Sequence, residues 1–471
     1  MNTHARLVLT FTAATLSLAS TIALHAVAYT RTTGGNWSDA TLWTPTGGPP
    51  GADDTATFTL GNASASLTLD STGATTIKDF HVGSTTGGYT FTFTSPGSGS
   101  TGHRSINITG TLSKANDTTK IVFENSASST RLLNVSIGKL DLATNGGSAA
   151  FGRADGTRAL NNLTIGETIL GGGGGSNSVA LFLNVSNDYS LGKLTFNTGN
   201  NAKTVYLVSN TATAAGYART ATVNGITDTS SNATIQGSAR DTSSDTKNAA
   251  TLRIETTNTE DTFTAATALI DGTGGTLALR KTGSGTQTLT GASTYTGGTE
   301  IEQGTLVIRG PGTLAATGDL AIATGASFVT ATEAALTLRN ATLATGAILG
   351  FDLAAPGARL ALTNNLTHDT AHSAGGNATF IIDFLGTGLL DHAYSGLLSV
   401  AGTTNDFASA TLSYKNFGAQ NLSGTLTFAQ LANGFTITAG NIPEPALTAL
   451  LGGLAILGLV TLARCRRING K

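Results

Sequence analysis

The stretch LNVSIGKLDLATNGG (residues 133–147) returns 50 residues later as LNVSNDYSLGKLTFNTGN (residues 183–200). The two align as Leu-Asn-Val-Ser followed by hydrophobic-Gly-Lys-Leu-x-hydrophobic, with a four-residue insertion in the second copy. Between them, NNLTIGE places Asn162 28 residues after Asn134, and INITG places Asn107 27 residues before Asn134. Degenerate units with periods of roughly 20–50 residues are typical of solenoids. We expect these asparagines to occupy recurrent turn positions and to stack from coil to coil.

Alternation of apolar and polar residues predicts short strands along the chain. Clear examples are YTFTFTS (89–95), KIVFEN (120–125), TVYLVS (204–209) and GTLVIRG (304–310). Between residues 30 and 440, no long stretch repeats apolar residues at helical spacing. The sequence therefore predicts an all-β fold, a right-handed parallel β-helix whose stacked coils bury one continuous core. An array of β-sandwiches, which also has short strands at even spacing, is the alternative.

Composition excludes several functional classes. Charged residues make up 11% of the chain and the formal net charge is −2, so no basic surface is expected for nucleic acid. The one cysteine, Cys465, lies close to the C-terminus. The region before it therefore cannot form a disulfide, a thiolate metal site or a cysteine nucleophile.

The N-terminus has the layout of a secretory signal peptide. A short region with His4 and Arg6 precedes an apolar run (7–24), and Ala26 and Ala28 form an A-x-A cleavage pattern. We expect cleavage after Ala28, so that residues 1–28 are a signal peptide used by the Sec translocon and signal peptidase. A permanent N-terminal anchor is the alternative, although threonines and serines interrupt the apolar run.

Two internal segments resemble bacterial surface proteins of the autotransporter-passenger type. GNWSDATLWTPTGGPPGADDTATF (35–58) is similar to their opening motif, and GSGTQTLTGASTYTGGTEIEQGTLVIRG (283–310) is similar to the autotransporter-associated β-strand repeat. Ser293 stands where the family commonly has Asn. The positions that match the repeat pattern are Thr294, Tyr295, Thr296, Gly297, Gly298, Thr299, Gly304, Thr305 and Leu306. Physically, we expect one β-coil with a tight Gly297-Gly298 corner and Tyr295 covering an apolar face.

This resemblance divides the exported region. We expect a cap with the opening motif (29–60), degenerate coils (61–282), the repeat (283–310) and further coils (311–440). Trp37 and Trp43 are interpreted as a hydrophobic plug over the first coil, since a repeat stack needs its end shielded. Asp53 and Asp54 are interpreted as loop residues, because adjacent side chains point in different directions.

Candidate catalytic or metal-binding clusters are few. They are His368, Asp369 and His372 in HDTAH, Asp241 and Asp245 in DTSSD, and Glu300 and Glu302 in EIE. The two histidines lack a third ligand at metal-site spacing, and we interpret their segment as a solvated loop. Glu300 and Glu302 share one strand face, as a calcium site would require, but no loop supplies the other oxygen ligands. We expect no catalytic residue, no metal and no cofactor.

The C-terminus carries a second apolar segment. Residues 446–463 are apolar or small apart from two threonines, and a helix of this length spans about 27 Å. Arg464, Arg466 and Arg467 follow directly, which predicts a transmembrane helix whose end stays in the cytoplasm. A self-exporting passenger would instead end in strands of an outer-membrane barrel.

Pro443, Glu444 and Pro445 stand immediately before this span. Together with the span and the arginines, they resemble the PEP-CTERM sorting signal (441–471). The resemblance implies export, a transient stay in the inner membrane, and recognition by an exosortase-type transpeptidase. The prolines would keep the recognised segment extended. A simple tail anchor is the alternative.

The sequence as a whole predicts a non-catalytic β-solenoid, tethered to the inner membrane and then displayed at the cell surface, at the outer membrane or in the extracellular matrix. Its expected role is adhesion, biofilm matrix or envelope structure, with exopolysaccharide as an expected partner. The alternative function is a β-helical polysaccharide lyase or hydrolase, since parallel β-helices also carry such enzymes.

Overall fold

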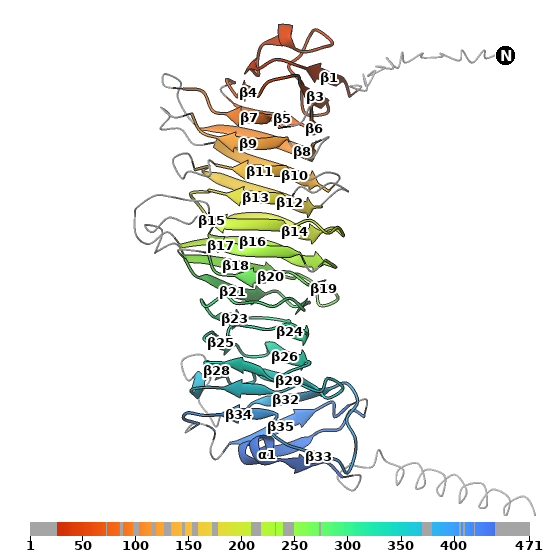
Figure 1. Cartoon of the computed structure of the whole chain (residues 1–471), viewed down its shortest axis with the longest axis vertical. Coiled ribbons are helices and arrows are strands. Elements are labelled where there is room, and N and C mark those ends of the chain that lie inside the picture. The colour runs from red at the N-terminus through yellow and green to blue at the C-terminus, as the bar shows by residue number, and fades with distance from the viewer. Residues whose placement is uncertain are drawn as a thin grey trace, which may run out of the picture.

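The computed structural model is an elongated column of stacked β-coils (Figure 1). It describes residues 26–438 except 72, 85–87, 98–102, 115–118, 127–132, 144–146, 153–158, 172–177, 209–217, 231, 239–248, 273–274, 370–378, 405–406, 408–409 and 419. Within this part of the chain, strands of successive coils pair in parallel. The antiparallel strand pairs lie near the C-terminal end, and one isolated antiparallel bridge, between Thr30 and Thr44, lies at the N-terminal end. The predicted parallel β-solenoid is confirmed, and the sandwich array is excluded.

Each coil passes over up to three faces of the column. The first face contains β5 (Ala74–Ile77), β18 (Ala249–Glu255), β21 (Leu277–Thr282), β23 (Thr299–Ile301), β25 (Asp319–Ile322), β28 (Asn340–Ala344) and β31 (Leu366–Asp369). The second face contains β1 (Ala28–Arg31), β3 (Thr55–Leu60), β6 (Asp79–Ser84), β19 (Thr262–Ala265), β22 (Thr286–Leu289), β24 (Thr305–Gly310), β26 (Ser327–Thr332), β29 (Ile348–Asp352), β32 (Ile381–Leu385), β35 (Thr411–Lys415) and β36 (Gly424–Thr427).

The third face is a separate sheet followed by a shorter one. The first of these sheets contains β2 (Gly35–Asn36), β4 (Ala65–Thr68), β7 (Thr90–Thr94), β9 (Lys120–Glu124), β11 (Gly147–Phe151), β13 (Val179–Leu183), β15 (Lys203–Val208), β17 (Ala233–Ser238) and β20 (Ala268–Ile270). The second contains β27 (Leu336–Leu338), β30 (Leu360–Leu362) and β34 (Leu398–Val400). The four strands named in the sequence analysis correspond to β7, β9, β15 and β24.

Long strands join the first face to the second in the N-terminal half of the column. They are β8 (Arg104–Lys114), β10 (Leu133–Leu142), β12 (Asn162–Leu170), β14 (Tyr189–Phe196) and β16 (Ala218–Asp228). A column of glycines lies where these strands turn from one face to the other. A Cβ on Gly166 would lie 2.6 Å from the carbonyl oxygen of Gly138, the equivalent glycine one coil earlier. Only glycine fits where backbones approach this closely.

Inward side chains alternate with outward ones and form one continuous core. In β3, for example, Ala56, Phe58 and Leu60 are buried while the threonines between them are partly exposed. Phe93, Phe123 and Phe151 stack from coil to coil, with ring centroids 4.5 and 5.0 Å apart. The parallel register places identical side chains one above another, so the core consists of ladders.

Coil length changes along the column. Paired residues are 28 positions apart at Asn134 and Asn162 but 20 positions apart at Leu279 and Thr299. Residues 290–298, between β22 and β23, contain no strand on the third face. The column is correspondingly narrower around β23 to β26 (Figure 1). The spacing of 28 positions is therefore not a fixed period, since paired residues before the predicted repeat also lie 26 positions apart (Thr164 and Ser190) and 32 positions apart (Tyr189 and Ala221).

The expected asparagine ladder is present in part, from Asn134 onward. The Oδ1 atom of Asn134 accepts hydrogen bonds from the Nδ2 atoms of Asn161 and Asn162, at 2.8 and 2.9 Å. Asn187 continues the ladder by donating to Asn162 Oδ1 at 2.9 Å. Asn134 and Asn162 belong to strands rather than turns, so the ladder stabilises the edge of the first face.

Two parts of the repeat alignment are wrong. Asn107 pairs with Ser136 rather than with Asn134, whose partner on β8 is Ser105. The second Leu-Asn-Val-Ser begins at Leu183, the last residue of β13 on the third face, whereas the first opens β10 on the first face. The Gly-Lys-Leu halves are equivalent, because Lys139, Glu167 and Lys193 stack in one column. The two Leu-Asn-Val-Ser segments therefore occupy different positions in the coil although their sequences are identical.

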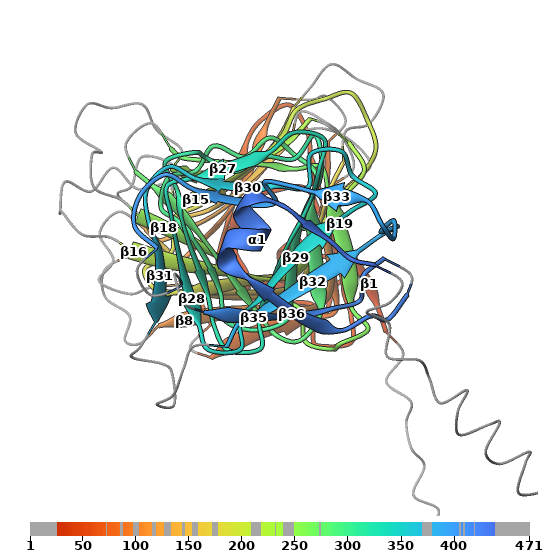
Figure 2. The ribbon, with the colours of Figure 1, turned by 90° about the horizontal axis from the view of Figure 1, so that it is seen from below.

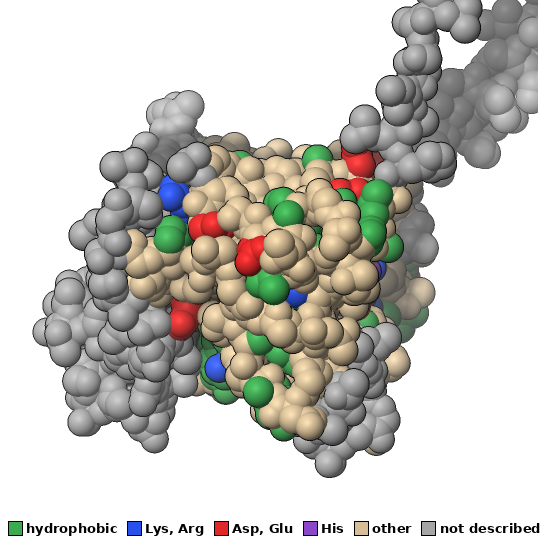
Figure 3. Space-filling model, turned by 90° about the horizontal axis from the view of Figure 1, so that it is seen from above, with side chains coloured by type: hydrophobic (Ala, Val, Ile, Leu, Met, Phe, Trp, Pro, Cys, Tyr) green, Lys and Arg blue, Asp and Glu red, His purple; other side chains and the backbone are tan. Residues whose placement is uncertain are grey.

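The N-terminal end of the column is closed by aromatic residues. Trp37 and Trp43 are buried with ring centroids 5.2 Å apart, and Trp37 also packs against Phe80. The guanidinium of Arg31 lies 5.1 Å from the Trp43 ring centroid, and η1 (Ala40–Leu42) lies between the two tryptophans in sequence. Seen from this end, the surface is mostly neither charged nor hydrophobic (Figure 3).

The C-terminal end is closed by a short helix. The helix α1 (Phe428–Asn433) lies across the end of the column (Figure 2), and its Leu431 is buried. Thr427 and Gln430 form a capping box at its N-terminus. The small antiparallel pair β33 (Ala393–Tyr394) and β37 (Phe435–Thr436) flanks it.

No helix in the described residues is long and apolar enough to cross a membrane. The predicted transmembrane segment, residues 446–463, lies outside the described residues.

Candidate functional site

The coil of the predicted repeat contains all of its motif residues in defined positions. Tyr295 is buried, and its hydroxyl lies 2.6 Å from Thr299 Oγ1. Burial raises the pKa of the Tyr295 phenol far above its ordinary value, so it stays protonated. Leu306 and Ile308 point into the core, while Val307 points outward and packs in a small separate cluster. This division is the alternation of a β-strand, whose successive side chains point to opposite faces.

The glycines of the repeat form its corners. Gly298 has a φ of +88° and Gly304 a φ of +71°, values that side-chain-bearing residues rarely adopt. Glycine is required at position 297 for a different reason, because a Cβ there would lie 2.5 Å from the carbonyl oxygen of Leu277. One glycine of the predicted pair therefore supplies the conformation, and the other permits close approach.

Three polar residues that sequence reasoning did not single out hold this coil. The carboxylate of Asp271 accepts hydrogen bonds from the backbone N–H groups of Leu277 (2.7 Å) and Thr296 (3.1 Å). It also accepts one from the Thr296 hydroxyl at 2.6 Å. Asp271 precedes Thr296 by 25 residues, and no local pattern signals that contact.

Gln287 and Lys281 are the other two, and both are buried. The Gln287 amide bonds to the backbone of Ile226, and the Lys281 ammonium donates to the carbonyl oxygens of Thr282, Gly283 and Gln303 at 2.8, 2.8 and 3.2 Å. Gln287 lies two positions before Leu289, so strand alternation could have placed it on the core side.

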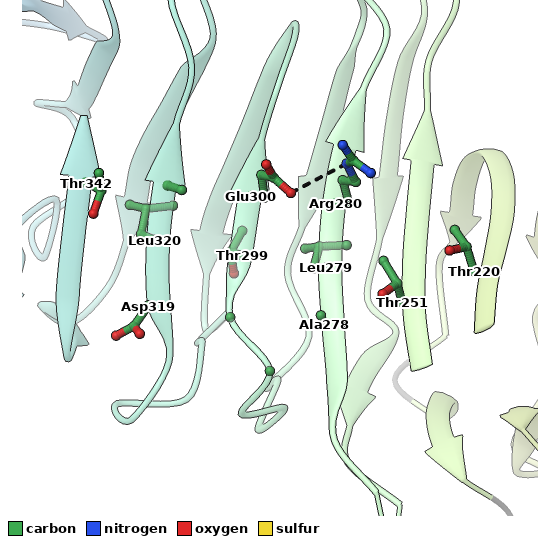
Figure 4. A pocket seen from close by; sticks show the side chains of 13 residues that line it. Thr220, Thr251, Ala278, Leu279, Arg280, Thr299, Glu300, Asp319, Leu320 and Thr342 are labelled. Carbon is green, nitrogen blue, oxygen red and sulfur yellow. Dashed lines mark ion pairs between the residues drawn. The ribbon is translucent and has the colours of Figure 1, made fainter. Parts of the chain in front are cut away.

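A shallow groove follows the outer side of the first face across β21, β23, β25 and β28 (Figure 4). It consists of two hollows of about 370 and 290 Å³ that share Glu300, Ala321 and Thr342. The register aligns these residues in one column with Arg280 and, one strand earlier, Arg253. We call this surface the first-face groove.

The charges in the first-face groove are paired. Arg280 Nε lies 3.5 Å from Glu300 Oε2 and 2.6 Å from Glu302 Oε1. Both glutamates thus reach one guanidinium, as their expected position on the same face allows. In the described residues, no group of three or more His, Cys, Asp or Glu side chains could hold a metal ion.

Asp319 lies on the edge of the same groove. It accepts hydrogen bonds from Arg339 at 2.9 and 2.6 Å and from Asn340 Nδ2 at 2.9 Å. The hydrogen bond from Arg339 is the main cause that lowers the pKa of Asp319, and it raises the pKa of Arg339 in turn. The carboxylate is therefore a permanent hydrogen-bond acceptor at neutral pH.

The lining of the first-face groove suits an uncharged polar ligand. Thr220, Thr251 and Thr342 contribute hydroxyl groups to it, whereas the hydroxyl of Thr299 is paired with the buried Tyr295. The carboxylates of the groove are paired with arginines, so they can accept hydrogen bonds without adding much net charge. Hydroxyl-rich chains such as polysaccharides are ligands of this chemical type, since they donate and accept hydrogen bonds along their length.

The remaining predicted clusters do not form a site in the described residues. His368 and Asp369 lie on β31 rather than in a loop, which corrects that interpretation. His368 Nε2 is 3.0 Å from Thr345 Oγ1, and the ring packs edge-on against Phe380. Asp369 lines the second hollow of the first-face groove. His372, Asp241 and Asp245 lie outside the described residues.

The predicted processing signals lie at or beyond the ends of the described chain. Ala26 is exposed and precedes β1, and Ala28 is the first residue of β1. The sorting residues (Pro443, Glu444 and Pro445) and the topology residues (Arg464, Arg466 and Arg467) lie outside the described residues.

Comparison with known proteins identifies one similarity. The family model of the passenger-associated transport repeat matches residues 279–308, which run from β21 into β24. No curated protein and no solved structure is significantly similar to the chain. The chain is thus a parallel β-solenoid in which residues 279–308 are similar to the passenger-associated transport repeat.

Proposed function

We propose that this protein is an exported, non-catalytic β-solenoid of the bacterial surface or extracellular matrix, with a role in adhesion, biofilm matrix or envelope structure. The observation that carries the proposal is the passenger-associated transport repeat at residues 279–308, set within a parallel β-solenoid. A long column with both ends covered presents its side faces to partners and resists uncontrolled stacking.

The proposed route uses both ends of the sequence. The signal peptide directs the chain to the Sec translocon and signal peptidase, and the tail holds it in the inner membrane until an exosortase-type transpeptidase acts at Pro443-Glu444-Pro445. Replacement of Glu444, or of both prolines, should leave an unprocessed chain in the inner-membrane fraction. The exposed Glu260 provides a control, since Glu260→Gln should be sorted normally. Unchanged size and location of the Glu444 variant would leave only a tail anchor.

The proposed partner is an exopolysaccharide of low charge, bound along the first-face groove. The supporting features are the threonine hydroxyls and the arginine-paired carboxylates of its lining. Binding of neutral and acidic polysaccharides to the processed protein can be compared by calorimetry. The double variant Glu300→Gln and Glu302→Gln should weaken binding about tenfold or more, since two charge-assisted hydrogen bonds are lost. Glu333→Gln, at an exposed position outside the groove, should not.

A polysaccharide-degrading enzyme is the second candidate. Its supporting observation is the pair Glu300 and Glu302 within an elongated groove. The processed protein should be incubated with acidic polysaccharides with and without calcium, and released unsaturated or reducing ends measured. Turnover that disappears in the Glu300→Gln or Glu302→Gln variant would overturn the non-catalytic proposal.

A further inference from the structure

The first strand of the column begins inside the predicted signal peptide. Ala28 pairs with Thr55 in the parallel register of β1 and β3. The backbone carbonyl of Val27 accepts a hydrogen bond from Thr55 N at 3.0 Å. The backbone nitrogen of Val27 donates to Asp54 Oδ1 at 2.7 Å. Val27 and Ala28 therefore both make backbone hydrogen bonds or strand contacts with the first coil.

Asp54 is held rigidly as the acceptor of this contact. Its second carboxylate oxygen, Oδ2, accepts from Gly51 N at 2.7 Å. Its carbonyl accepts from the backbone N–H groups of Lys78 (3.1 Å) and Asp79 (3.4 Å) on the next coil. The carboxylate is thus fixed on one side by its own loop and directed with the other side at Val27.

Cleavage after Ala28 would remove these partners. Asp54 Oδ1 and the N–H of Thr55 would each lose a hydrogen bond at the edge of the column. Cleavage after Ala26 would keep both hydrogen bonds and turn the Val27 amide nitrogen into an α-ammonium, 2.7 Å from a carboxylate oxygen. A charge-assisted hydrogen bond is stronger than the neutral one it replaces.

We propose that signal peptidase hydrolyses the Ala26–Val27 bond and that the new α-ammonium of Val27 pairs with Asp54 to lock the first coil. Water supplies the hydroxyl group to the Ala26 carbonyl carbon and a proton to the Val27 nitrogen, and the proton released by the new Ala26 carboxylic acid converts that amine into the α-ammonium. Ala26 meets the requirement for a small residue before the cut, and Leu24 replaces alanine at the other recognition position. The inference rests on the proposed export of the chain.

The first test is the N-terminal sequence of the exported protein. The full chain is produced in a Gram-negative host, and the translocated species is analysed by N-terminal sequencing and intact mass. A chain that starts at Val27 is the expected result. A chain that starts at Tyr29 overturns this inference but leaves export intact. A chain that keeps Met1 and fractionates with the cytoplasm overturns both this inference and the proposed function.

The second test measures the pKa of the new α-amine by isotope-edited NMR after reductive methylation. Pairing with Asp54 should raise it above about 8, the value of a free terminus. Other charged residues near the site are Asp53, Lys78 and Asp79. Asp54→Asn should return the pKa to about 8, whereas the matched neighbour Asp53→Asn should leave it raised. An amine unaffected by Asp54→Asn would show that no ion pair forms, and would overturn the inference.

Discussion

Gln287 supplies a partner for the backbone of a neighbouring strand. Its Nε2 donates to the carbonyl of Ile226 at 3.1 Å and its Oε1 accepts from the N–H of Ile226 at 2.9 Å. In the described residues, β16 and β19 pair only at Asp228 and Ala265, so Ile226 has no partner on β19. A side-chain amide has one N–H donor type and one carbonyl acceptor, as a peptide unit has. The Gln287 amide can therefore take the place of a backbone partner for Ile226.

The first prediction follows from that bond. Gln287→Leu keeps the volume of the side chain but leaves a buried N–H and a buried carbonyl without this partner. We expect the free energy of unfolding to fall by about 2–4 kcal/mol, as measured by urea denaturation. Gln303 is exposed and lies between β23 and β24, so Gln303→Leu should change the free energy of unfolding little. Equal effects of the two variants would contradict the proposed role of the amide.

The second prediction concerns Lys281. Burial lowers its pKa to about 8, from an ordinary value of 10.5. The unfolded chain therefore binds more protons than the folded one between these two values, and stability should rise with pH across this window. Compared with Lys281→Met, the wild-type free energy of unfolding should gain about 1–2 kcal/mol between pH 7.5 and 9.5.

The control for Lys281 is a lysine on the surface. Lys139 is partly exposed and pairs with Asp141 at 3.1 Å, so Lys139→Met should leave the pH dependence of unfolding as it is in the wild type. If Lys281→Met also leaves the pH dependence of unfolding unchanged, the pKa of Lys281 is not lowered in the folded protein. The three carbonyl oxygens around the ammonium would then compensate for its desolvation.

At the scale of single elements, the bend of the long strands depends on the glycine column. Gly138, Gly166 and Gly192 lie one above another at the change from the first face to the second. Register irregularities occur next to Gly138 and Gly192, as expected where one strand must bend over a corner.

The third prediction tests this column. Gly166→Ala places a Cβ 2.6 Å from the carbonyl oxygen of Gly138, which forces two packed strands apart. We expect a loss of about 1–3 kcal/mol in the free energy of unfolding. Gly61→Ala is the matched control, because a Cβ at Gly61 meets no atom within 4 Å. A tolerated Gly166→Ala would show that the corner can relax.

At the scale of the whole molecule, covered ends decide whether the column stays a single particle. The strand β1 would present an open edge, but Thr30 and Thr44 exchange backbone hydrogen bonds at 2.7 and 3.0 Å and cover part of it. Trp43 anchors that covering segment in the core. Open edges of parallel sheets recruit further strands.

The fourth prediction follows from this cover. Trp43→Ala should release the segment around Thr44 and expose β1, so the exported protein should elute as oligomers in size-exclusion chromatography with light scattering. Leu389→Ala provides the control, since Leu389 is a large hydrophobic residue that is 60% exposed. A monomeric Trp43→Ala protein would show that other contacts close the end.

Much of the candidate site could be predicted locally. The glycine and tyrosine positions of the repeat follow from a pattern in which backbone conformation and residue type are tied within one coil. Asp271 and the groove could not be predicted in this way. Asp271 acts on residues of the next coil, and the groove forms because Arg280, Glu300 and Thr342 come from three different coils in one column.

The sequence by itself determined the fold class. Alternation with a period of two decides which side chains face the core, and glycines mark the corners, so an all-β solenoid follows from local physics. Only the tertiary structure decided which residue lies above which. Asn107 misses Asn134, and the coil shortens from 28 to 20 positions, because register depends on contacts with neighbouring coils. The alternation of apolar and polar residues repeats every two positions. A strand shifted by two residues against its neighbour therefore satisfies it equally well.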